Sequence, residues 1–238
     1  MKKDVYTDPM ASEISNARIA ARFGLSFTIM GVALFGSAGT LLWPEAWLYI
    51  MLHLGYTFLI TAWLKLHDPE LLKSRMQLIS PTSRSWDSRF FWLLILLFLL
   101  YLILCGLDAV RYGWSTVPLP VQTGALVLLT WALWLIFRVM QENSFASPMI
   151  EVQRGRGHKV IDSGPYAHVR HPMYTATIVF SFALPVWLGS LWALLLAAVI
   201  SVMLGCRIFA EEKTLHAELD GYTAYTRRVR YRLIPKVW

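Results

Sequence analysis

The chain has few cysteines and no glycine-rich nucleotide-binding motif, so it lacks the features of disulfide-rich extracellular domains and of soluble cofactor domains. Only two of its 238 residues are cysteines, Cys105 and Cys206, and they fall in different apolar runs, with no CxxC pattern and no neighbouring histidine pair. This spacing supports neither a disulfide framework nor a metal site. No GxGxxG follows a candidate strand, which excludes a Rossmann cofactor domain. No internal repeat or low-complexity tract is visible.

Charged residues are also scarce. They make up 16% of the chain, against about 25% in a typical soluble domain. The hydrophobic share is 56% and the mean hydropathy is +0.49. These values exclude a soluble domain and predict an all-α integral membrane protein. The first apolar run follows a polar stretch and has no small-residue cleavage site, so we expect a permanent anchor rather than a signal peptide.

Apolar runs predict about six membrane segments. A helix needs about 20 residues to cross a hydrocarbon core of about 30 Å, and four runs have that length. Residues 174–209 form a further run, interrupted at Pro185 and Gly189. They predict a helical hairpin with a short first arm, 174–188, and a nearly full-length second arm, 191–209. The four preceding spans are expected at 23–42, 46–66, 90–110 and 119–139.

The basic residues are distributed unevenly along these segments. In the six-span arrangement 21 of the 22 lysines and arginines lie on one side of the membrane, and only Arg111 lies on the other. Because basic residues are retained on the cytosolic face, we expect both termini in the cytosol. The net charge of +7 is then explained by topology and contact with anionic lipids, not by nucleic-acid binding.

Two segments outside the spans are expected on the cytosolic surface. Residues 1–22 are interpreted as a polar helix or tail, and 68–88 as a connector. Asp68-Pro69 is a helix-start signal, which predicts one short interfacial helix, and Ser80-Pro81 is a turn signal. Within the apolar runs, Asp108 is interpreted as a structural partner of Arg111.

Polar and aromatic residues gather just before the hairpin. Residues 164–174 read GPYAHVRHPMY, and Gly155 and Gly157 precede them. Glycines allow backbone conformations closed to other residues, and Pro172 suits the first turn of a helix, which would place His171 at the cap. Ionisable groups at the edge of apolar segments are costly unless they bind something. We therefore predict a functional loop here.

A second polar cluster ends the hairpin. Arg207 and Glu211 are four residues apart on one helix face, and Glu212 is next to Glu211. An i, i+4 ion pair contributes only about 0.3–0.5 kcal/mol. It does not explain an arginine at the membrane boundary or a second carboxylate that adds repulsion. A cationic ligand would relieve that repulsion.

These segments, together with the stretch from Gly221-Tyr222 to Ile234-Pro235, resemble the integral membrane methyltransferases of the isoprenylcysteine carboxyl methyltransferase and phospholipid methyltransferase superfamily. The resemblance agrees in order and spacing. It implies that S-adenosylmethionine lies in a cytosol-facing pocket between the last helices, closed by the loop before the hairpin and by the C-terminal tail. It also divides the chain into N-terminal membrane helices with their connector, 1–140, and a methyltransferase core, 141–238.

The resemblance implies roles for individual residues. Arg207 would face the substrate. By residue type, Glu212 and His171 are the evident candidates for a base if the acceptor is an amine. Glu151 or Gln153 could supply a further polar contact, and both alternatives remain open. The sulfonium of the cofactor is a permanent cation, for which a carboxylate and phenol faces are suitable partners. The implied cofactor-binding residues are His158, Lys159, Val160, Ile161, Tyr166, His171, Pro172, Met173, Tyr174 and Glu211.

The expected activity is methyl transfer to a membrane lipid or a lipidated, amphiphilic acceptor at the membrane–cytosol boundary, as in isoprenylcysteine carboxyl methyltransferases. N-methylation of phosphatidylethanolamine is the alternative. Sterol reductases share a similar tyrosine-rich ending and would use NADPH, but they are longer and have more spans. A non-catalytic transporter should carry polar groups near mid-bilayer, whereas here they cluster at one face. The sequence carries no signal for an oligomeric state.

Overall fold

The structure, a computed structural model, describes residues 15–77 and 85–238, and within them every regular element is helical. Five of these helical segments are long and apolar enough to cross a membrane, and α6 is a shorter apolar helix, as the hairpin interpretation predicts. The elements are α1 (Asn16–Gly31), continued by η1 (Val32–Gly36), α2 (Pro44–His67), α3 (Pro69–Met76), α4 (Ser85–Gly106), continued by η2 (Leu107–Arg111), α5 (Leu119–Glu142), η3 (Arg154–Arg156), η4 (Gly164–Ala167), α6 (Pro172–Trp187), α7 (Ala193–Glu218) and α8 (Tyr222–Arg228).

The helix starts follow the local sequence signals. Pro69 and Pro172 each begin a helix, because a missing N–H costs nothing in the first turn. The side chain of Asp68 caps α3 by accepting the backbone N–H of Leu71 at 2.9 Å, which confirms the predicted short helix. The turn signal at 80–81 lies outside the described residues. The first span differs from its prediction: α1 already begins at Asn16, and the helical segment ends at Gly36.

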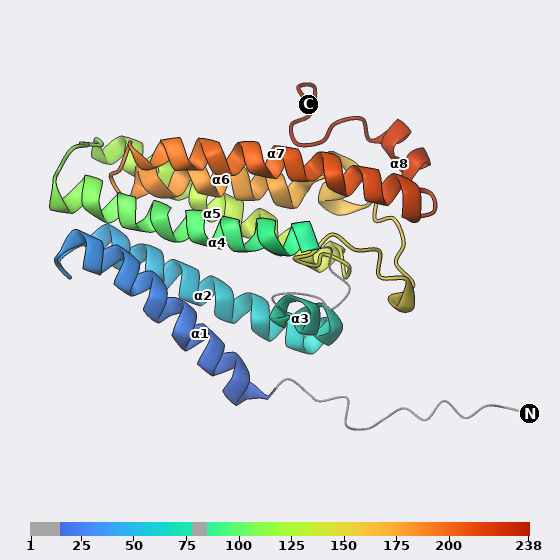
Figure 1. Cartoon of the computed structure of the whole chain (residues 1–238), viewed down its shortest axis with the longest axis horizontal. Helices are drawn as coiled ribbons and strands as arrows, with labels where there is room; N and C mark the ends of the chain where they lie inside the picture. The colour runs from blue at the N-terminus through green and yellow to red at the C-terminus, as the bar shows by residue number, and fades with distance from the viewer. Residues whose placement is uncertain (1–14, 78–84) are drawn as a thin grey trace, which may run out of the picture.

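The helices form a bundle with most connections at its two ends (Figure 1). α4, α5, α6 and α7 run side by side, with α1 and α2 along one flank. α5 and α6 have the most extensive packing of any pair, and α6 also packs on α7, which confirms the hairpin. α3, α8 and the segment between α5 and α6 gather at the same end of the bundle.

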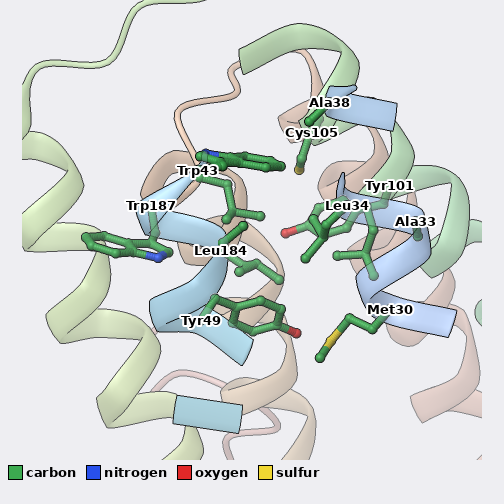
Figure 2. Close-up of a cluster of buried hydrophobic side chains, with 14 of the residues drawn as sticks. Met30, Ala33, Leu34, Ala38, Trp43, Tyr49, Tyr101, Cys105, Leu184 and Trp187 are labelled. Carbon is green, nitrogen blue, oxygen red and sulfur yellow. The ribbon is translucent and has the colours of Figure 1, made fainter. Parts of the chain in front are cut away.

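A buried apolar cluster holds the first helices against α4 and α6 (Figure 2). Close packing of α4 on η1 requires Gly106: a Cβ there would lie 2.7 Å from the carbonyl oxygen of Leu34 and 2.9 Å from the backbone nitrogen of Ala38. The Trp187 indole donates to the carbonyl of Glu45 at 2.9 Å. These contacts hold α4 against η1 and α6 against α2, and α4 and α6 both supply walls of the site described below.

Asp108 of η2 joins the end of the third long helical segment to the turn between α6 and α7. Its Oδ2 accepts hydrogen bonds from the hydroxyls of Ser115 (2.8 Å) and Ser190 (2.6 Å) and from the backbone N–H of Trp192 (3.1 Å). The expected pairing with Arg111 is therefore wrong. The sequence suggested it by proximity along the chain, whereas the fold brings the hairpin turn to this carboxylate.

Candidate functional site

The residues singled out in the sequence converge on one cavity at the α3 and α8 end of the bundle. Its volume is about 460 Å³, within the range of about 300–1,000 Å³ typical of small-molecule sites. α4, α6, α7, α8 and the segment 143–161 form its walls. Glu151 contributes to the lining, whereas Gln153 does not. The predicted residues that line it are His158, Lys159, Val160, Ile161, Tyr166, His171, Met173, Tyr174, Arg207 and Glu211.

Two predicted residues are not part of this lining. Pro172 is buried in the first turn of α6. Glu212 is buried too, and both of its oxygens face cations: Oε1 accepts from Arg170 Nε at 2.6 Å and Oε2 from Arg232 Nε at 2.8 Å. His171 Nε2 lies 3.4 Å from Oε1. This geometry argues against Glu212 as a general base and makes it the centre of a structural ion-pair cluster.

Glu211 points into the cavity instead. Its Oε2 accepts a hydrogen bond of 2.5 Å from the Tyr174 hydroxyl, and its Oε1 lies 3.9 Å from His171 Nδ1. The two adjacent glutamates of α7 thus face different surroundings, because successive residues on a helix are rotated by about 100°. One carboxylate neutralises arginines inside the protein, and the other is available to a ligand.

Arg207 lines the cavity and forms a buried ion pair with Asp87. Its Nη2 lies 3.0 Å from Asp87 Oδ1 and donates to the carbonyl of Pro148 at 2.6 Å. Asp87 is fully buried in the first turn of α4 and also accepts the backbone N–H of Ile150 at 2.7 Å. The sequence analysis missed Asp87. An acidic residue just before an apolar span was the available signal, but it is equally typical of an exposed helix start.

Arginines from three elements hold the segment that forms one cavity wall. The carbonyl of Ser144 accepts from Arg156 at 3.0 Å, and that of Ala146 accepts from Arg75 at 2.6 Å. Arg207 donates to the carbonyl of Pro148, so the carbonyls of residues 144, 146 and 148 each accept a hydrogen bond from an arginine. Arg156 is itself anchored to α3 through Glu70 at 2.8 Å. A segment without regular secondary structure is thereby positioned.

His158 contributes an aromatic face to the cavity. Its ring stacks on Phe145 with 4.4 Å between centroids and 18° between planes. Its Nδ1 accepts the backbone N–H of Gln153 at 3.2 Å, which places the ring proton on Nε2. Burial and the nearby Arg156 cation lower the pKa of His158. The imidazole is therefore neutral near pH 7.

Glycines allow two of the turns in this region. Gly157 and Gly164 have φ of +66° and +54°, which side chains rarely adopt, whereas Gly155 has no positive φ. A Cβ at Gly164 would also lie 2.8 Å from Glu142 Oε2. The prediction that glycines shape this loop is confirmed at two of the three positions.

The residues after α8 form a strap, 229–238, against the start of α6. The backbone N–H groups of Arg170 and His171 donate to the carbonyls of Tyr231 and Arg232, each at 2.9 Å. The Arg170 guanidinium also donates to the carbonyl of Val229 at 3.0 Å. Arg170 and His171 thus hold the C-terminal strap beside the cavity. Tyr222 and Tyr225 of α8 supply part of the cavity lining.

Comparison with known proteins gives two matches. A family model described as phospholipid methyltransferase matches residues 121–219, from α5 to the end of α7. The protein-S-isoprenylcysteine O-methyltransferase of Schizosaccharomyces pombe is 27% identical over 164 residues, which cover 61% of this chain and 70% of the relative. The region matched by the family model contains most of the residues that line the cavity.

Proposed function

We propose that the chain is an integral membrane methyltransferase, as its similarity to the family model and to the relative described above suggests, and that it transfers the methyl group of S-adenosylmethionine to the carboxylate of a lipidated or otherwise amphiphilic acceptor. The observation that carries this proposal is the convergence of Glu211 and Arg207 on one cavity. A carboxylate suits a sulfonium cofactor, and a guanidinium suits a carboxylate acceptor. The cytosolic position of both termini, and the division into 1–140 and 141–238, are part of the proposal.

The residues of the cavity fit the cofactor. When bound, S-adenosylmethionine supplies an electrophilic methyl group on a positively charged sulfur. The Glu211 carboxylate, held by Tyr174, offers the negative charge. His158 and Phe145 offer a stacked aromatic face for a planar base. Met173 and Val160 add apolar surface to the same lining.

The chain's contribution to catalysis is mainly positioning. Methyl transfer to a carboxylate needs in-line approach and no proton removal, so orientation of the two reactants supplies most of the rate. Arg207 would hold the acceptor carboxylate while Asp87 and Pro148 fix its guanidinium. The apolar side chains of α4 in the lining, Leu94 and Phe98 among them, would accommodate the lipid part of the acceptor.

The other activities considered from the sequence are less well supported. Both matches are methyltransferases, which leaves the reductase and transporter alternatives without support. Transfer to an aminophospholipid remains a second candidate, because the family model carries that description. An amine acceptor would require a base, and Glu212 is held in an ion-pair cluster, which leaves His171 and Glu211.

The proposal is tested with radiolabelled S-adenosylmethionine and matched acceptors. We expect a prenylated cysteine with a free carboxylate to be methylated, and its amide and phosphatidylethanolamine to remain unmodified. Turnover with the carboxylate should be nearly flat above pH 6, because the acceptor is already ionised there. Methylation of the aminophospholipid with a rate that rises steeply with pH would favour the second candidate.

Glu211→Gln should weaken S-adenosylmethionine binding by about 10- to 100-fold, because a charged contact to the sulfonium is lost. Tyr174→Phe is the matched control: it removes the hydroxyl bonded to Glu211 but keeps the carboxylate, and should weaken binding by less than about tenfold. Isothermal titration calorimetry on the purified protein measures both. Equal losses in the two variants would show that Glu211 acts only through its hydrogen bond to Tyr174.

A further inference from the structure

Arg75 is a cation in the cavity wall with no anionic partner in the described part of the chain. It lies in α3, outside the matched family region and far along the chain from the motifs singled out in the sequence. Its guanidinium donates to the carbonyl of Ala146 at 2.6 Å, and among residues 15–77 and 85–238 it forms no ion pair. Since a guanidinium carries five donors, one carbonyl leaves most of them available to a ligand.

Arg207, unlike Arg75, has an anionic partner in the described residues. Both guanidinium groups line the cavity and both hold a carbonyl of the same wall segment. The charge of Arg207 is balanced by the buried carboxylate of Asp87, whereas Arg75 has no such neighbour in the described residues. A half-buried cation without a counter-charge has lost part of its hydration, so a ligand anion is favoured at this point of the cavity.

Tyr166 supplies a second donor in the same cavity lining as Arg75. Its hydroxyl oxygen accepts a hydrogen bond from Asn143 Nδ2 at 2.8 Å, and within the described residues its own O–H donates to no protein acceptor. Burial raises the pKa of Tyr166 above its usual range, while the Asn143 hydrogen bond and the nearby Arg75 charge oppose that rise. The phenol is therefore protonated near pH 7 and free to donate.

We infer that Arg75 and Tyr166 form a carboxylate-binding pair that receives the α-carboxylate of the amino-acid end of S-adenosylmethionine. The inference rests on the proposed function. A guanidinium and a phenol that both line the cavity provide two donors suited to the two oxygens of a carboxylate. Arg207 is the proposed contact of the acceptor carboxylate, which leaves the cofactor as the source of the carboxylate for Arg75 and Tyr166.

The test compares two ligands that differ only in the carboxylate: S-adenosylmethionine and its decarboxylated analogue. Arg75→Met should weaken binding of S-adenosylmethionine by about 10- to 100-fold and leave the analogue nearly unchanged. Arg75→Lys should recover part of the loss, because it keeps a charge without the fork of donors. Tyr166→Phe should produce a smaller loss, again confined to the ligand with the carboxylate. Calorimetry on the detergent-purified full chain measures the affinity of the wild-type protein and of each variant for both ligands.

Arg156→Met is the matched control, since Arg156 also holds a carbonyl of the same segment but does not line the cavity. It should affect both ligands alike. If Arg75→Met weakened the binding of both ligands equally, Arg75 would only position the cavity wall, and the inference would be overturned. Unchanged S-adenosylmethionine affinity with a raised KM for a carboxylate acceptor would also overturn it. A wild-type protein that binds neither ligand would instead refute the proposed function.

Discussion

Replacing Arg207 by alanine should abolish methyl transfer and also destabilise the protein. Arg207 is the proposed contact of the acceptor carboxylate, and loss of a two-pronged charged contact should lower kcat/KM by at least about 100-fold. The same change leaves Asp87 buried without its counter-charge, which costs about 3–5 kcal/mol when one partner of a buried pair is removed. Transfer assays and thermal unfolding in detergent measure the two effects.

A double variant separates these effects. Asp87→Asn combined with Arg207→Met removes both charges, so most of the stability should return, since a buried pair replaced by neutral groups is often close to neutral. Activity should stay low, because the acceptor contact is still absent. Affinity for S-adenosylmethionine should change little. If the double variant regained activity, Arg207 would be only the counter-charge of Asp87, and its substrate role would be refuted.

Replacing Glu212 by alanine should destabilise the protein more than the same change at Glu211. Glu212 is the shared partner of Arg170 and Arg232, and Arg170 is buried with carbonyls of the strap 229–238 as its other acceptors. Removing the carboxylate leaves Arg170 uncompensated, at a cost of about 3–5 kcal/mol. Thermal unfolding in detergent and limited proteolysis of the strap would detect this.

Glu211→Ala is the neighbouring control for Glu212→Ala. Glu211 is more exposed and lines the cavity, so its loss should affect cofactor affinity much more than unfolding. A Glu212→Ala protein with wild-type stability and no activity would contradict the structural role and restore the general-base hypothesis. The stability of the Glu212→Gln protein is expected to lie between those of Glu211→Ala and Glu212→Ala, since an amide keeps hydrogen-bonding capacity without the charge.

Sequence signals identified many of the residues that line the candidate site because these residues are confined to short segments. The residues of 158–161 and 171–174 lie close together along the chain, and the i, i+4 spacing of Arg207 and Glu211 fixes a common helix face. The sequence also placed the hairpin, since Gly189 interrupts an apolar run where the turn forms, whereas Pro185 lies within α6. These inferences depend on local geometry alone.

Local sequence patterns did not distinguish the roles of Glu211 and Glu212. Both are plausible catalytic groups by type and position, and only packing assigned one to the cavity and the other to Arg170 and Arg232. Arg75 and Asp87 could not be recognised, because their importance depends on wall and ion-pair contacts with residues about 60 to 120 positions away along the chain.

The sequence by itself determined that this is a helical membrane protein, approximately where its segments begin and end, and which short motifs supply the candidate site. Hydrophobic length and residue type are properties of the chain, so they can be inferred without coordinates. The tertiary structure decided which charges are paired with each other and which face the cavity. The side chain that meets a given charge is set by the packing of distant helices, as Asp87 and Arg207 of α4 and α7 illustrate.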